Sequence, residues 1–392
     1  MKTNKLFQKA LSAAQRVAFC AVAVLLAMHL LSHAPAEAVY ATQYTFSALL
    51  PKALPGSANG TGVTGFSCVE GVAVDCAGTV YVASARNQTI SRMTPDGIVT
   101  ILAGCPGVSG SADGTGTNAR FSFPRGLAVD KAGNVFVADS RNGTIRRVTP
   151  AGKVTTLAGE AGCEGSADGI GVNAQFLLPM AVALDGAGNI YVADALNDEI
   201  RKVTPGGRVT TLAGQPRNEG SADGRGGQAR FFCPAGLAVD KTGNVYVADS
   251  GNNLIRKVTP RGVVTTLAGQ LNYIEGGADG RGKAAHFFHP EGLAVDTAGN
   301  VYVTDTGDAT IRRLTPAGEV ETLGGFAGAT GTTDGAGRAA RFTMPLDVTI
   351  DGAGNLYVAD AGNGALRKGI PTSTFAVSDQ PRKMQLSMAE RH

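Results

Sequence analysis

Short runs of β-branched and other apolar residues alternate with turns along most of this chain. In residues 126–179, four such runs fall at 127–130, 134–138, 144–149 and 153–158. The turns at 130–133 and 149–152 each end in glycine, which tolerates the positive φ that a tight hairpin needs. The pattern predicts an antiparallel meander of four strands.

Both faces of this predicted sheet are apolar. Successive side chains of a strand point to opposite faces, and residues such as Val135, Ile145 and Leu157 leave neither face polar. A lone four-stranded sheet could not expose two apolar faces to water, so each sheet is expected to pack between copies of itself.

The unit recurs along the chain, as in GLAVDKAGNVFVADS from Gly126 and GLAVDKTGNVYVADS from Gly236. Six copies are marked by the repeat aspartates Asp75, Asp130, Asp185, Asp240, Asp296 and Asp351. These aspartates are 55, 55, 55, 56 and 55 residues apart. Six four-stranded antiparallel sheets packed face to face around an axis form a six-bladed β-propeller, an all-β fold.

The two ends of the repeat region predict how the ring closes. The sixth unit ends near Leu366 without a fourth strand, whereas residues 44–49 precede the first unit where such a strand would lie. We therefore expect the N-terminal strand to complete the last blade, with 374–378 as a weaker candidate for the same place. The predicted propeller spans 44–370, and the polar segment 371–392 is expected to be a disordered tail.

The first 38 residues have the features of a signal peptide. Residues 1–16 are basic, residues 17–31 form a 15-residue apolar run, and Ala36-Glu37-Ala38 has small residues at the spacing of a cleavage site. The run is shorter than the roughly 20 residues that span a bilayer, so an uncleaved anchor is the less favoured alternative. The sequence predicts export to the periplasm or the cell exterior, with no membrane contact after cleavage.

The repeat resembles a known family. The cadence GLAVDxxGNVYVADSxNxxIRKVTPxG, clearest from Gly236 to Gly262, is similar to the NHL repeat, and the resemblance extends over residues 44–370. It implies a propeller fold but no single function, because the family includes protein- and RNA-binding modules, the peptidyl-hydroxyglycine lyase and extracellular bacterial proteins.

Charge does not point to a nucleic-acid partner. The chain has 35 Lys and Arg against 32 Asp and Glu, a formal net charge of +3. The leader holds Lys2, Lys5, Lys9 and Arg16 and one acid, Glu37, so the mature charge is zero. Binding to a polyanion needs a basic surface. The absence of Trp also weakens carbohydrate capture, because sugar platforms rely on large aromatic faces.

The long connection between consecutive units carries its own motif, such as GSADGTGTNARFSFP from Gly110. Long loops often carry binding sites, so their face is the expected functional surface. The motif aspartates are Asp113, Asp168, Asp223, Asp279 and Asp334. One carboxylate per loop is too few for calcium, which takes about six to eight oxygens. We expect each aspartate to cap a turn, paired where possible with an arginine seven residues downstream: Arg120, Arg230 or Arg341.

Two further repeated features are expected to serve the scaffold. The motif phenylalanines should fill the gaps between blades; they are Phe121, Phe176, Phe231, Phe287 and Phe342. Asp139 and Asn142, with their copies, should bond backbone amides in tight turns.

Positions that differ among the copies are candidates for ligand contact, because shared positions serve the blade. Five residues before each repeat aspartate, the ring reads Glu70, Arg125, Met180, Ala235, Glu291 and Leu346. The next position is glycine or alanine except at Asp347. Blades 5, 6 and 1 are neighbours in a closed ring, so Glu70, Glu291 and Asp347 could converge at the channel mouth. They could hold a divalent cation or raise one another's pKa for acid/base work; the alternative is three solvated charges.

A basic sector is expected beside the acidic one. Arg86 and Arg141 occupy equivalent positions just after the second strand of the first two units, and Arg125 belongs to the second unit. Together these arginines could bind an anionic group.

Cysteine and histidine positions add little chemistry. Five cysteines lie outside the leader, and Cys105 and Cys163, in corresponding loops, are the best disulfide candidates. One ring position, seven before each repeat aspartate, reads Cys68, Phe123, Leu178, Cys233, His289 and Met344, where packing is favoured over a metal site. Three mature histidines, one of them in the tail, disfavour a three-histidine zinc centre.

The sequence therefore favours a non-enzymatic binding scaffold that acts through its long-loop face and channel mouth. Its partner would be a protein or a small molecule, without nucleic acid, and the chain would be a monomer. The alternative is a hydrolase or lyase similar to the propeller lactonases, with a divalent cation such as calcium at the mouth carboxylates. No cofactor is required by the first interpretation.

Overall fold

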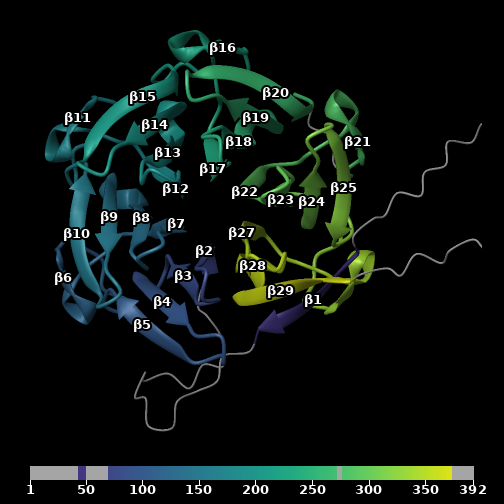
Figure 1. Ribbon diagram of the computed structural model, residues 1–392, viewed down its shortest axis with the longest axis horizontal. Coiled ribbons are helices and arrows are strands. Elements are labelled where there is room, and N and C mark those ends of the chain that lie inside the picture. Colours follow the sequence, from purple (N-terminus) through teal and green to yellow (C-terminus); the bar gives the residue numbers. More distant parts are fainter. Residues whose placement is uncertain (1–42, 50–68, 272–275, 373–392) are drawn as a thin grey trace, which may run out of the picture. The chain divides into compact units, whose positions relative to one another are not determined.

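The computed structural model describes residues 43–49, 69–271 and 276–372. These residues form six antiparallel sheets arranged around a central axis (Figure 1), so the six-bladed propeller is confirmed. The predicted leader and most of the predicted tail lie outside the described residues. No helix in the described ranges is long and apolar enough to cross a bilayer.

Each blade is numbered by the repeat that supplies its inner strand, and its strands run in order from the axis outward. Blade 1 comprises β2 (Val69–Val74), β3 (Val80–Ser84), β4 (Thr89–Met93) and β5 (Val99–Ala103). Blade 2 comprises β7 (Pro124–Val129), β8 (Val135–Asp139), β9 (Thr144–Val148) and β10 (Lys153–Ala158). Blade 3 comprises β12 (Pro179–Leu184), β13 (Ile190–Asp194), β14 (Glu199–Val203) and β15 (Arg208–Gly214).

The second half of the ring repeats this order. Blade 4 comprises β17 (Pro234–Val239), β18 (Val245–Asp249), β19 (Leu254–Val258) and β20 (Val263–Gly269). Blade 5 comprises β22 (Pro290–Val295), β23 (Val301–Asp305), β24 (Thr310–Leu314) and β25 (Glu319–Gly324). Blade 6 comprises β27 (Pro345–Ile350), β28 (Leu356–Asp360), β29 (Ala365–Thr372) and β1 (Gln43–Leu49).

Five sheets carry a fifth, outermost strand that the sequence pattern does not predict. These two-residue strands are β6 (Gly114–Thr115), β11 (Gly169–Ile170), β16 (Gly224–Arg225), β21 (Gly280–Arg281) and β26 (Gly335–Ala336). Each belongs to a long connection and pairs with the fourth strand; in blade 2 the partners are Lys153 and Val154. A strand of two residues has no apolar alternation by which to recognise it.

The N-terminal strand closes the ring as predicted. β1 pairs antiparallel with β29 along its full length, from Gln43 opposite Thr372 to Leu49 opposite Leu366. Phe46 is fully buried, and a Cβ added at Gly369 would lie 2.5 Å from its ring. The weaker candidate, 374–378, lies outside the described residues.

The core lies between blades, where the motif phenylalanines pack. Phe121 is fully buried in a cluster that joins Tyr81 and Ala83 of blade 1 to Val135 and Val137 of blade 2. The four equivalent phenylalanines are at most 1% exposed. The predicted role of these rings is therefore confirmed.

A buried ion-pair network holds each long connection to its blade. In blade 2, Arg146 is fully buried and contacts Asp139 and Asp113 through Nη1 and Nη2, each at 2.7 Å. The same three-residue network recurs around Arg201, Arg256, Arg312 and Arg367. The prediction that Asp113 pairs with Arg120 is wrong, because Arg120 donates instead to the carbonyls of Thr117 and Ala119.

Asp139 and Asn142 serve the scaffold as predicted, but the expected bonds to amides within a tight turn are wrong, because these side chains join separate segments of the chain. Asp139 accepts hydrogen bonds from the Ser122 amide at 2.7 Å and from Asn142 Nδ2 at 2.8 Å. Burial raises the pKa of Asp139 to about 6, although Arg146 and these donors oppose the rise. The carboxylate is therefore stabilised by neighbours that the fold brings to it.

The expected disulfide is absent. Cys105 and Cys163 are free thiols, as are Cys76 and Cys233. Each candidate is held within its own loop: Cys105 forms a β-bridge with Val108, and Cys163 Sγ donates to Glu160 at 3.4 Å.

Candidate functional site

The inner strands of the six blades surround a channel that contains a cavity of about 370 Å³. Antiparallel pairing places the start of each inner strand beside the end of the second strand, as Pro124 lies opposite Asp139 in blade 2. We call this end of the channel the mouth. β2 contacts both β7 and β27, so the ring of inner strands is continuous.

Four charged residues line the cavity at the mouth: Glu70, Arg125, Glu291 and Asp347. Arg125 Nε lies 3.1 Å from Glu70 Oε2, and its Nη2 lies 3.0 Å from Glu291 Oε2. Arg125 belongs to blade 2 and Glu291 to blade 5, which stand opposite each other in a ring of six. The Arg125 side chain therefore crosses the channel.

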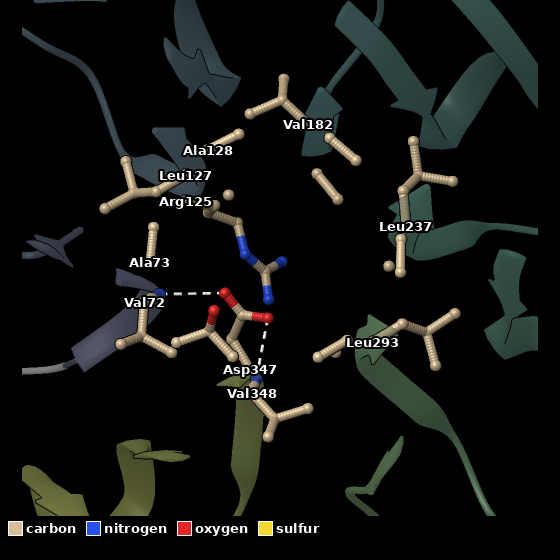
Figure 2. Close-up of a pocket in the computed structure, with 18 of the residues that line it drawn as sticks. Val72, Ala73, Arg125, Leu127, Ala128, Val182, Leu237, Leu293, Asp347 and Val348 are labelled. Carbon is tan, nitrogen blue, oxygen red and sulfur yellow. Dashed lines mark hydrogen bonds between the residues drawn. The ribbon is translucent and has the colours of Figure 1, made fainter. Parts of the chain in front are cut away.

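Asp347 joins two blades through backbone amides. Its carboxylate accepts hydrogen bonds from the amides of Val72 and Val348, each at 2.9 Å. Figure 2 shows these two bonds, and it shows Arg125 and Asp347 pointing toward one another within the channel. Inner strands approach so closely here that a Cβ added at Gly292 would lie 2.4 Å from the Asp347 Cα. Asp347 is accommodated at this position because its carboxylate accepts a hydrogen bond from a backbone amide of the neighbouring blade.

The mouth carboxyls all have raised pKa values. Burial raises the pKa of Asp347 to about 7, although the Val72 and Val348 amides and Arg125 oppose the rise. Burial also raises the pKa of Glu70 and of Glu291, and Arg125 opposes it at both residues. One guanidinium is therefore ion-paired with Glu70 and Glu291 and acts on Asp347 at longer range, so the protonation of the three carboxyl groups is coupled.

The structure thus brings Glu70, Glu291 and Asp347 to one cavity, with a guanidinium where the sequence hypothesis placed a metal. Among the described residues, no group of three or more His, Cys, Asp or Glu side chains is placed to hold a metal ion. Nor are the acidic and basic sectors separate, because Arg125 reaches across the channel to the carboxylates. The sequence contains one sign of this contact: Arg125 is the one basic residue among the six equivalent inner-strand positions.

The other two arginines of the expected basic sector remain outside this cluster. Arg86 and Arg141 are exposed, and neither forms an ion pair with a described residue. The Arg141 guanidinium lies over the Phe123 ring, 4.6 Å from its centroid. These two positive charges therefore stand at the surface beside the mouth.

Three segments of the chain, residues 121–147, 231–258 and 287–314, match the NHL repeat family model. Each runs from a motif phenylalanine through the inner three strands of a blade. The described residues therefore form a six-bladed β-propeller that carries NHL repeats, as the resemblance in the sequence indicated.

Curated relatives share the repeat over part of their length. The chloroplastic protein SUPPRESSOR OF QUENCHING 1 of Arabidopsis thaliana is 28% identical over 282 residues, which cover 68% of this chain and 27% of that protein. Human NHL repeat-containing protein 2 is 34% identical over 151 residues, covering 35% of this chain and 21% of that protein. The chain thus spans about a quarter of the length of these relatives.

Solved structures share the fold. An auxiliary nutrient binding protein from Bacteroides ovatus has a TM-score of 0.60 at 18% identity, covering 84% of this chain and 77% of that chain. A gluconolactonase from Xanthomonas campestris has a TM-score of 0.55 at 15% identity, covering 85% and 92%. Identities this low establish the common architecture alone.

Proposed function

We propose that this chain is an exported binding module that captures a ligand at the mouth of its channel without chemical conversion. The observation that carries the proposal is the arginine that crosses a cavity of about 370 Å³ and is held by Glu70 and Glu291 from two other blades. A concave site with a few convergent polar groups is the usual form of a ligand site.

The internal repeat supports this location. Equivalent positions of five units form the same buried ion pair, whereas the second residue of the inner strand differs in charge and size from blade to blade. A scaffold alone gives no reason for this variation. The Bacteroides ovatus neighbour, described as a nutrient binding protein, supports the use of such a propeller for capture.

The proposal is tested by screening small metabolites for an increase in melting temperature. Ligand that binds only the folded state stabilises by about 2.7 kcal/mol at a hundredfold excess over Kd. We expect stabilising compounds whose effect is lost in Arg125→Gln and retained in Arg261→Gln. Arg261 is an exposed arginine of a turn at the opposite end of blade 4. Equal stabilisation of all three proteins, or none, would contradict binding at the mouth.

A divalent-cation-dependent hydrolase similar to the lactonases is the second candidate, because three carboxyl residues share the cavity. It predicts that millimolar calcium raises the melting temperature and that Asp347→Ala removes the rise. A melting temperature that does not respond to calcium would refute this candidate and leave the binding module in place.

A further inference from the structure

The channel below the mouth is aliphatic. Two residues beyond the position of Glu70 and its equivalents, every inner strand has a buried valine or leucine that lines the same cavity: Val72, Leu127, Val182, Leu237, Leu293 and Val348. Figure 2 shows these side chains around Arg125 and Asp347. Strand residues rise about 3.3 Å each, so this aliphatic ring lies roughly 7 Å along the strands from the charges. A small molecule in the cavity therefore meets charge at one end and aliphatic surface at the other.

The charged side chains of the cavity keep bonding positions of both signs. Arg125 uses Nε toward Glu70 and Nη2 toward Glu291, and no described residue accepts a hydrogen bond from its Nη1. Glu291 meets the guanidinium through Oε2, and no described residue donates to its Oε1. The Glu291 side chain is 22% exposed, against 8% for Glu70. Among the described residues, the cavity thus has an unused donor on Arg125 and an unused acceptor on the more open of its two glutamates.

An ion that enters this cavity disturbs the pairs already present. A lone cation would compete with Arg125 for its two glutamates. A lone anion would add a negative charge beside Glu70, Glu291 and Asp347. Breaking a pair in a desolvated site is costly because it leaves one charge without a partner. A zwitterion avoids both outcomes, since its cationic group pairs with a glutamate while its anionic group pairs with the guanidinium.

The geometry of the existing ion pair favours a short zwitterion. Arg125 Nη2 and Glu291 Oε2 are 3.0 Å apart, so a ligand that bonds to both side chains needs its own two charges close together. An α-amino acid has them on either side of a single carbon atom. Its side chain leaves the same carbon, and an aliphatic side chain directed along the channel would cover the ring of valines and leucines.

We infer that the cavity binds a free α-amino acid with an aliphatic side chain, its carboxylate on Arg125 and its ammonium group on Glu291. The inference rests on the proposed function and gives its ligand a chemical class. Glycine would leave the aliphatic ring uncovered, and a charged side chain would be buried there without a partner. All three parts of the ligand are therefore needed.

The test is isothermal titration calorimetry of the full chain with L-leucine and, in parallel, L-valine and L-methionine. Arg125→Gln and Glu291→Gln should each weaken binding about tenfold or more, because each removes one charge-assisted contact. Both variants should still fold, since blade 4 has the neutral Ala235 at this position, and melting temperatures check this. Arg261→Gln and Glu319→Gln change exposed charges far from the cavity and should bind as the unmodified chain does.

Compounds that lack one part of the ligand then test its class. Isocaproate has the chain and acid of leucine without the ammonium group, isoamylamine has the chain and amine without the acid, and glycine has both charges without the chain. Each should bind about tenfold or more weakly than leucine.

Two results would overturn the inference. One is binding of an aliphatic amino acid that is unchanged in Arg125→Gln and Glu291→Gln, with melting temperatures preserved. The other is isocaproate or isoamylamine binding as tightly as leucine. If none of the three amino acids binds while other metabolites still stabilise the chain through Arg125, the ligand class is wrong and the binding function stands. If no metabolite stabilises the chain, both are refuted.

Discussion

Replacing Glu199 by threonine should stabilise the propeller, and the gain should grow with pH. Glu199, in β14 of blade 3, is 2% exposed, and its Oε2 atom has no hydrogen-bond partner. The nearest cation is Arg201 Nη1 at 3.7 Å, but this arginine already holds Asp194 and Asp168 at 2.8 Å each. Three other blades have threonine at this position: Thr89, Thr144 and Thr310. Blade 3 therefore buries a carboxyl group that the fold does not require.

The size of the effect follows from the pKa. Burial raises the pKa of Glu199 from 4.5 to about 7; Arg201 opposes the rise, and Asp194, Asp168 and Asp198 add to it. An unfolded chain releases this proton at the ordinary pKa, so stability falls as pH increases from 4.5 toward 7 and stays low above it. The complete loss is about 3 kcal/mol, at 1.36 kcal/mol per pH unit. Below the ordinary pKa the ionisation penalty is absent.

Urea unfolding at pH 5 and pH 8 measures the gain. Glu199→Thr should raise the free energy of unfolding by about 3 kcal/mol at pH 8 and by less than about 1 kcal/mol at pH 5. The carboxyls that do not interact with Glu199 are common to both proteins and cancel in the comparison. Glu319→Thr, at an exposed position of β25, is the control and should show no such dependence. A gain equal at both pH values, or a loss at pH 8, would refute the reasoning.

Two further changes test the scaffold, each by chemical unfolding. Arg256→Ser should lower the free energy of unfolding by about 3–5 kcal/mol, because it leaves Asp249 buried without its cation. Adding Asp249→Ser should recover part of this loss. A double variant that loses more than the sum of the two single variants would contradict the pairing. Phe46→Ala should cost about 3–5 kcal/mol by opening the strand that closes the ring, and a cost below about 1 kcal/mol would mean that β1 does not seal blade 6.

The sequence alone predicts the six-bladed architecture, because each blade is built from a short segment of the chain and the segment is repeated. Turn glycines, alternating apolar runs and the spacing of the repeat aspartates predict six blades, and the missing last strand predicts the role of 44–49. The internal repeat also separates positions that serve every blade, such as Phe121, from those that vary. These inferences rest on local sequence patterns and on the spacing of the repeats. None of them requires knowing which distant residues of one unit contact each other.

Contacts between segments that come together only when the chain folds back on itself are not predictable in this way. Asp113 meets Arg146, 33 residues later, whereas the sequence offered Arg120 only seven residues away. The internal repeat nevertheless contains a signal: blade 1 has Ser84 in place of the second-strand aspartate and Ser91 in place of the buried arginine. The two charges are present together or absent together, as expected for a buried pair.

The order of the blades in the ring predicts which charged residues meet at the mouth only in part. Adjacency of blades 5, 6 and 1 places Glu70, Glu291 and Asp347 near one another, but the reach of Arg125 across the channel depends on channel width and side-chain length. Neither quantity is contained in a repeat pattern. The packing of Phe232 over Gly251 was missed for a related reason: the glycine has meaning only beside the ring that the fold lays over it.

The two sets of buried charges differ in a way that bears on function. In the scaffold, a buried aspartate such as Asp249 has an arginine at 2.6 Å, an amide donor and an asparagine of its own. At the mouth, Glu70 and Glu291 share the one guanidinium of Arg125, and Asp347 accepts hydrogen bonds from two backbone amides without an ion pair of its own. A buried carboxylate that has a cation of its own resists change, whereas carboxyl groups that share one cation respond to a charge that enters. The mouth is therefore the place where binding of a ligand would shift protons and displace a salt bridge without disturbing the blades.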